Sequence, residues 1–129
     1  MFTQLSILLS SIVLGIMLFF SFVIAPITFK SLNEDNARVF IRKIFPYYYN
    51  VNLTLCFIAT LFFVFVETYS LDVYLIISTT ILFGISSFVL MPLINKFRDN
   101  QEDRKFKYLH MTSVIINFIQ IIFLILIIF

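Results

Sequence analysis

Four long apolar stretches, separated by short polar or charged segments, dominate the chain. They are residues 5–29, 46–66, 73–93 and 109–129. A helix rises about 1.5 Å per residue, so each stretch is long enough to cross a hydrocarbon core of about 30 Å. The pattern predicts an all-α fold, a polytopic four-helix membrane bundle in which residues 1–129 form a single integral membrane domain.

Between the first two stretches, residues 31–45 follow an amphipathic helical pattern, with apolar side chains recurring at helical spacing. A polar stripe follows the other side: Glu34, Arg38 and Arg42. Asn33 is suited to cap this helix, because its side chain can accept hydrogen bonds from the first backbone N–H groups. We therefore expect a short amphipathic interfacial helix between spans 1 and 2. Phe45 and Pro46 would form a structural hinge between it and the second span.

Prolines and one short connection set the expected ends of the other spans. Pro26 frees the backbone carbonyl of Phe22, so the first helix is expected to bend or end there. The third span is expected to end near Pro92 and Asn95. Residues 67–72 form a tight link, which would make the second and third spans antiparallel neighbours.

The distribution of positive charge predicts how the spans are oriented. All nine Lys and Arg residues fall in two segments, residues 30–43 and 96–107, whereas residues 67–72 carry only two acids. Short loops rich in Lys and Arg stay on the cytoplasmic side of a membrane. We therefore expect a multi-pass protein, in a bacterial inner membrane, with both basic segments inside and both chain ends outside.

Composition supports assignment to the membrane class and argues against several kinds of function. A hydrophobic content of 61% with 12% charged residues lies far from the balance of soluble domains. The net charge of +2 comes from residues that flank spans, so nucleic-acid binding is not expected. Cys56 is the only cysteine, which excludes an intrachain disulfide and a cysteine-based zinc site. The sequence has no glycine-rich phosphate loop or nucleophile elbow, and we favour a role other than catalysis.

The clearest cluster of polar side chains lies on the last span. His110, Ser113, Asn117 and Gln120 stand at offsets of three, seven and ten, which places all four on one narrow helix face. Polar and ionisable residues within a span usually face the bundle interior or a cavity. We predict a ligand pocket open to the cytoplasm, to which Asn50 and Tyr48 of the second span contribute. An aromatic belt at headgroup level is an alternative explanation for Tyr48.

The same residues allow two other interpretations. Asn117 and Gln120 could join helices through interhelical hydrogen bonds, each contributing about 0.6 kcal/mol. His110 could instead bind a metal ion or a haem-like macrocycle, or relay a proton. A metal site would need further ligands, which the chain offers only as carboxylates or methionines, or from a second subunit.

Four short motifs occur in a fixed order between residues 21 and 117. They are Ser21-Phe-Val, Phe29-Lys-Ser-Leu32, Lys43-Ile-Phe-Pro-Tyr-Tyr48, and the spaced series Phe106, His110, Ser113 and Asn117. In these motifs the chain resembles the transmembrane protein 205-like family, a four-span membrane domain of undefined activity. The resemblance implies that the positions of interest are Phe45, Pro46, Tyr48, His110, Ser113 and Asn117. More distantly, the layout is similar to copper-resistance and haem-biosynthesis membrane proteins, which suggests a ligand pocket by analogy.

Three functional hypotheses remain open. The favoured one is a transport or resistance-type protein for a small molecule or metal, with a polar pocket at the cytoplasmic ends of spans 2 and 4. The second is a haem- or metal-linked membrane redox protein that uses His110. The third is a structural subunit of a membrane complex. The expected partners are the lipid bilayer and either further copies of the chain or a larger membrane complex.

Overall fold

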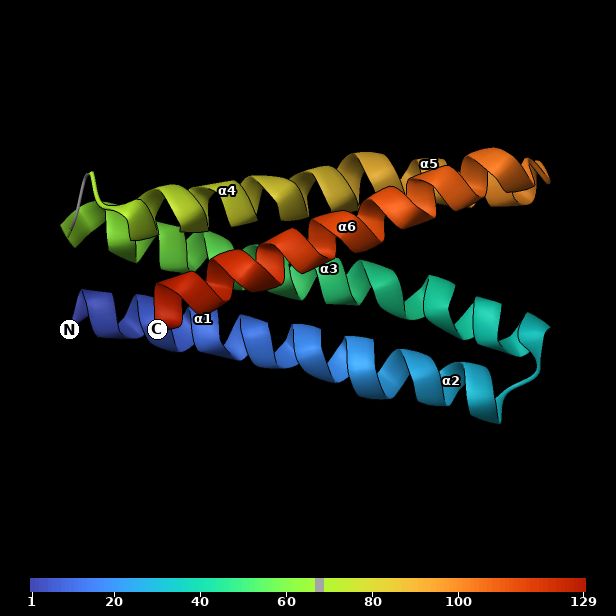
Figure 1. Ribbon diagram of the computed structural model, residues 1–129, viewed down its shortest axis with the longest axis horizontal. Coiled ribbons are helices and arrows are strands. Elements are labelled where there is room, and N and C mark those ends of the chain that lie inside the picture. Colours follow the sequence, from blue (N-terminus) through green and yellow to red (C-terminus); the bar gives the residue numbers. More distant parts are fainter. Residues whose placement is uncertain (67–68) are drawn as a thin grey trace.

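The computed structural model describes residues 1–66 and 69–129, and the regular secondary structure of this part is entirely helical. Four helical rods pack into a bundle (Figure 1). They comprise α1 (Phe2–Phe19), η1 (Phe20–Ile24) and α2 (Ala25–Ser31); α3 (Glu34–Val66); α4 (Leu71–Ile85), η2 (Ser86–Leu90) and α5 (Met91–Asp99); and α6 (Asp103–Ile128). This architecture confirms the predicted all-α four-helix membrane fold.

The surface of the bundle suits a lipid environment. In the part of the chain that the structure describes, four rods are long and apolar enough to cross a membrane. Many of their large apolar side chains lie on the outside of the bundle, including Phe22, Phe57 and Ile122. Each helix satisfies its backbone groups internally, as hydrocarbon requires. The chain is therefore a multi-pass membrane protein.

Small and polar residues accompany the large apolar residues in the interior. Ser6, Cys56 and Ala59 are fully buried, and Ser6 Oγ donates a hydrogen bond of 3.1 Å to the Ala59 carbonyl. Small side chains let helix backbones approach closely, which compensates for the absence of a hydrophobic driving force between helices in lipid. Alpha1 and α3 therefore form a close pair.

The charged connections gather at one end of the bundle. The connections from α2 to α3 and from α5 to α6 both lie there, and both chain ends lie at the other end (Figure 1). Because all nine Lys and Arg residues belong to the segments around these two connections, we call this end the basic end. Alpha3 and α6 both begin at the basic end and run in the same direction.

The predicted interfacial helix is not a separate element. Alpha3 continues without a break from Glu34 to Val66 and passes through Pro46. Asn33 caps it as predicted, its Oδ1 accepting a hydrogen bond of 2.9 Å from the Asn36 N–H. A proline removes one backbone donor, but Phe45 and Tyr48 on either side of it pack against Phe20 and hold the helix in place. Bending at Phe45 and Pro46 stays a prediction.

The helices of the first and third rods also continue past Pro26 and Pro92. Pro26 and Pro92 each occupy the second position of a helix, α2 and α5, that directly follows a π-helical segment. The wider π turn accommodates a ring that would otherwise clash with the carbonyl four residues earlier. The helical rods therefore reach Ser31 and Asp99. Where the membrane spans end along these rods stays a prediction.

The connection between α3 and α4 is described in part, since Glu67 and Thr68 lie outside the described residues. Alpha4 begins at Leu71, so Asp72 belongs to the helix and not to the predicted link. The two helices are antiparallel neighbours as predicted, and the hydroxyls of Thr60 and Thr80 lie 3.0 Å apart across their interface.

Candidate functional site

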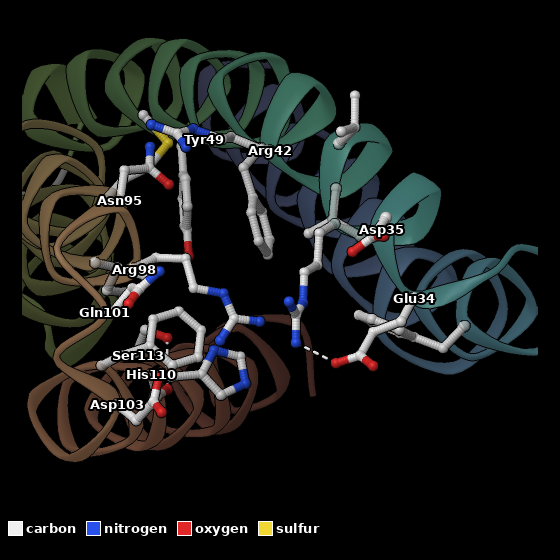
Figure 2. A pocket seen from close by; sticks show the side chains of 18 residues that line it. Glu34, Asp35, Arg42, Tyr49, Asn95, Arg98, Gln101, Asp103, His110 and Ser113 are labelled. Carbon is white, nitrogen blue, oxygen red and sulfur yellow. Dashed lines mark hydrogen bonds and ion pairs between the residues drawn. The ribbon is translucent and has the colours of Figure 1, made fainter.

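A large open cavity lies at the basic end, with a volume of about 980 Å³. Figure 2 shows side chains from α3, α5 and α6 that reach into it. Its lining is rich in charged and polar groups: Glu34, Asp35, Arg38, Arg42, Asn95, Arg98, Gln101, Asp103, His110 and Ser113. We call this space the polar cavity.

A second cavity of about 340 Å³ lies between the first rod, α3 and α6. Its wall is mostly apolar and aromatic, and includes Phe20, Phe22, Ala25, Val114 and Phe118. We call it the apolar cavity. The two cavities share six lining residues: Phe29, Ile41, Phe45, Tyr49, His110 and Ser113. They therefore adjoin, and together they extend from the charged end of the bundle into its apolar part.

A chain of hydrogen bonds crosses the wall of the apolar cavity. Tyr48 Oη donates to Asn117 Oδ1 at 2.9 Å, and Asn117 Nδ2 donates to Ser21 Oγ at 3.4 Å. All three residues line the cavity, and they come from three different rods. Two hydrogen bonds hold the Asn117 amide between α3 and the first rod, and so restrict its orientation in the cavity wall.

Aromatic rings surround this chain on the α3 side. Tyr48 lies 4.4 Å from Phe20 and 5.1 Å from Tyr49, measured between ring centroids, and Phe45 lies 5.7 Å from Tyr49. Tyr48 and Tyr49 are both buried. Aromatic pairs at such separations restrict ring orientation as well as burying area. The cluster therefore fixes the position of the Tyr48 hydroxyl, and the aromatic-belt alternative does not describe this buried residue.

Ion pairs neutralise two of the three arginines that line the polar cavity. Arg38 pairs with Glu34 within α3. Arg42 forms a two-pronged pair with Asp99, with N–O distances of 2.7 and 2.8 Å, and so connects α3 to the end of α5. Paired fork geometry of this kind is specific as well as attractive. The pair holds Arg42 at the wall of the cavity.

The third arginine is arranged differently. The Arg98 guanidinium lies 4.3 Å from the centre of the Phe106 ring, and the His110 ring stacks on Phe106 at 5.8 Å with an interplanar angle of 6°. Arg98 appears in none of the ion pairs found among the described residues. Figure 2 shows Arg98 and His110 next to each other inside the polar cavity.

The structure brings four of the five predicted ligand-binding residues to these cavities. His110 and Ser113 line both, while Tyr48 and Asn117 line the apolar one. Asn50 lines neither cavity; it is exposed and accepts a hydrogen bond of 3.1 Å from Ser87. The predicted pocket therefore has the first rod as a third wall, where the sequence indicated only spans 2 and 4.

His110 has no companion set of metal ligands in the described residues, where no three His, Cys, Asp or Glu side chains are grouped closely enough to hold an ion. Gln120, on the same helix, is buried and donates to the Thr79 carbonyl at 3.3 Å. This hydrogen bond joins α6 to α4, in agreement with the interpretation that Gln120 serves to connect helices.

Sequence reasoning missed Ser21 and Ser87, although a repeat in the sequence marks both. Ser21-Phe-Val and Ser87-Phe-Val are each followed by a proline and then by a lysine at identical spacing. In the structure, Ser21 pairs with Asn117 on α6, and Ser87 pairs with Asn50 on α3. Each half of the bundle thus makes one serine–asparagine contact. The Asn117 amide donates in the first and the Ser87 hydroxyl donates in the second, and only the first borders a cavity.

Comparison with known proteins gives one match. A search of curated proteins and a search of solved structures found no similar protein. A family model described as a domain of unknown function, DUF4149, matches residues 8–103, which cover the first three rods and both connections at the basic end. The match extends over most of the chain, and this protein belongs to the DUF4149 family.

Proposed function

We propose that this protein is a small membrane transporter that binds its substrate in the two adjoining cavities at the basic end. The observation that carries the proposal is the continuity of these cavities from the charged end of the bundle to the Tyr48–Asn117–Ser21 chain. Concave sites with mainly apolar walls and a few fixed polar groups are the usual form of small-molecule sites. Polar side chains inside a span also commonly mark substrate pathways.

Orientation follows from the distribution of charge. The positive-inside rule supports placing the basic end, and with it the mouth of the polar cavity, in the cytoplasm. The transporter would then receive or release its substrate on that side. We further propose kinship with the transmembrane protein 205-like family, which the motifs around Ser21, Pro46 and His110 support.

Thiol labelling from each side of the membrane tests for a transport route. Single cysteines at Ser113 and at Ser21 are introduced in a Cys56→Ala background and treated with an impermeant reagent in right-side-out and inside-out vesicles. We expect Ser113→Cys to react from the basic side, because Ser113 lines both cavities. Ser21 lies deeper, and Ser21→Cys is expected to react from both sides, as alternating exposure of one site requires.

Leu124→Cys is the matched control, because Leu124 is fully buried in the core and should react from neither side. Labelling of Ser21→Cys from the basic side alone would show a binding site without passage and would contradict the transport proposal. The absence of any reaction at Ser113→Cys would contradict the open cavity itself.

A further inference from the structure

The linings of the adjoining cavities differ in charge. The polar cavity carries charged groups from α3, α5 and α6, whereas the apolar cavity is walled mainly by aromatic and aliphatic side chains. A single molecule that fills both must therefore have a polar end and an apolar end. The volumes, about 980 and 340 Å³, are those of sites for small organic molecules.

The apolar cavity also reaches the outer surface of the bundle. Phe22 on η1 and Phe118 on α6 line it, and they are 65% and 56% exposed. In a membrane this surface faces hydrocarbon, so an acyl chain could pass between lipid and cavity without crossing water. A purely polar solute would make no favourable contacts with the apolar walls of this cavity.

Arg98 indicates the charge of the polar end. Arg38 and Arg42 are matched by Glu34 and Asp99, while the Arg98 guanidinium lies over the Phe106 ring and takes part in no ion pair found among the described residues. Its planar fork retains donors suited to a carboxylate or a phosphate. Asp35 and Asp103 also line the polar cavity, but neither is paired with Arg98.

His110 and Ser113 stand where the two cavities meet. His110 stacks on the same Phe106 ring that lies beneath Arg98, so these three side chains form one ordered group (Figure 2). Ser113 uses its hydroxyl proton on the His110 carbonyl at 2.7 Å, and its oxygen keeps acceptor capacity. A headgroup bound at Arg98 would thus lie at the entrance to the apolar cavity.

We propose that the joined cavities bind an amphiphilic anion, a carboxylate or phosphate monoester carried on a single acyl chain. The headgroup contacts Arg98 and His110, and the acyl chain lies in the apolar cavity beside Val114 and the Tyr48–Asn117 pair. This inference names the ligand class of the site proposed above for transport, and it rests on the binding-site part of that proposed function.

Equilibrium binding to the whole protein in nanodiscs of zwitterionic lipid tests the ligand class. The probes are dodecanoate and dodecyl phosphate as anionic amphiphiles, dodecanol as the neutral chain, dodecyltrimethylammonium as the cation, and acetate and inorganic phosphate as headgroups alone. We expect only the two anionic amphiphiles to bind saturably. Arg98→Gln should weaken their binding by about tenfold or more, because it removes a charge-assisted contact.

Arg104→Gln is the matched control. Arg104 is exposed on α6 and lines neither cavity, so its loss should leave binding unchanged. Equal weakening by Arg98→Gln and Arg104→Gln would reveal general attraction to positive charge and overturn the proposal. Equal binding of dodecanol and dodecanoate would overturn headgroup recognition, and binding of acetate or phosphate as tight as that of the amphiphiles would overturn the role of the apolar cavity.

A dodecanoate that carries a diazirine near its methyl end locates the acyl chain independently of any variant. We expect cross-links within residues 20–25 and 114–121, and cross-links confined to the outer faces of α4 or α5 would contradict the assignment. The binding assay and the thiol labelling test different proposals, because binding does not require transport. If the anionic amphiphiles bind saturably but Ser21→Cys is labelled from one side only, transport is disproved and the ligand class still stands. If Ser21→Cys is labelled from both sides but no anionic amphiphile binds, the transport proposal is supported and the proposed ligand class is disproved.

Discussion

The Tyr48 hydroxyl donates a hydrogen bond of 2.9 Å to the side-chain oxygen of Asn117, 69 residues further along the chain. The bond joins α3 to α6, two helices that run in the same direction from the basic end. It fixes the Asn117 amide so that its nitrogen reaches Ser21 on the first rod. One buried tyrosine thus aligns three rods around the apolar cavity.

Removing the two partners of this bond should reveal a modest coupling. In a double-mutant cycle with Tyr48→Phe and Asn117→Ala, we expect a coupling free energy of about 0.6 kcal/mol, the average for polar contacts between membrane helices. Reversible unfolding in mixed micelles measures it. A control cycle pairs Tyr48→Phe with Thr112→Val, whose hydroxyl bonds only within α6, and should give no coupling. A value near zero for both cycles would contradict the bond.

Asn52 offers a second test, because it is fully buried and neither polar atom of its amide has a partner among the described residues. A buried polar group without a hydrogen bond is destabilising. Asn52→Leu should therefore raise the free energy of unfolding, by about 1 kcal/mol. Asn50→Leu is the control, because Asn50 is exposed and accepts a hydrogen bond from Ser87. This substitution should not raise the free energy of unfolding. A loss of stability in Asn52→Leu would show that the amide has a partner such as a bound water.

The Arg42–Asp99 pair should connect α3 and α5 in a salt-dependent way. Asp99→Asn is expected to lower the thermal midpoint slightly, because both side chains are about half exposed and solvent screens their attraction. The difference from the unsubstituted protein should shrink as salt is added. The exchanged pair, Arg42→Asp with Asp99→Arg, should recover part of the midpoint. If the thermal midpoint of the exchanged pair is no higher than that of Arg42→Asp alone, the contact contributes nothing to stability.

Orientation in the membrane can be checked at Tyr69, which is 84% exposed between α3 and α4. In a Cys56→Ala background, Tyr69→Cys should react with an impermeant thiol reagent added to intact cells, because this connection lies opposite the basic end. Lys105→Cys, on the basic side, should react only after the membrane is opened. The opposite pattern would place the basic end outside.

Much of the fold was predictable because hydrophobic length is a local property. Each of the four apolar stretches lies within one helical rod, apart from the final residue, Phe129, and the cap at Asn33 follows from its own side chain. Whether a helix continues past a proline could not be predicted in this way, because it depends on the surrounding packing. Pro46, Pro26 and Pro92 each suggested an end or a hinge, yet π turns and aromatic packing carry the helices through.

The face of α6 that carries His110, Ser113 and Asn117 could also be found from the sequence, since helical spacing alone places them together. Which residues meet that face depends on how the rods pack, and only the tertiary structure decided it. Packing brought Ser21 and Arg98 to the cavities and turned Asn50 toward Ser87. Contacts between distant segments depend on the register and rotation of whole helices, which the period of a single helix does not encode.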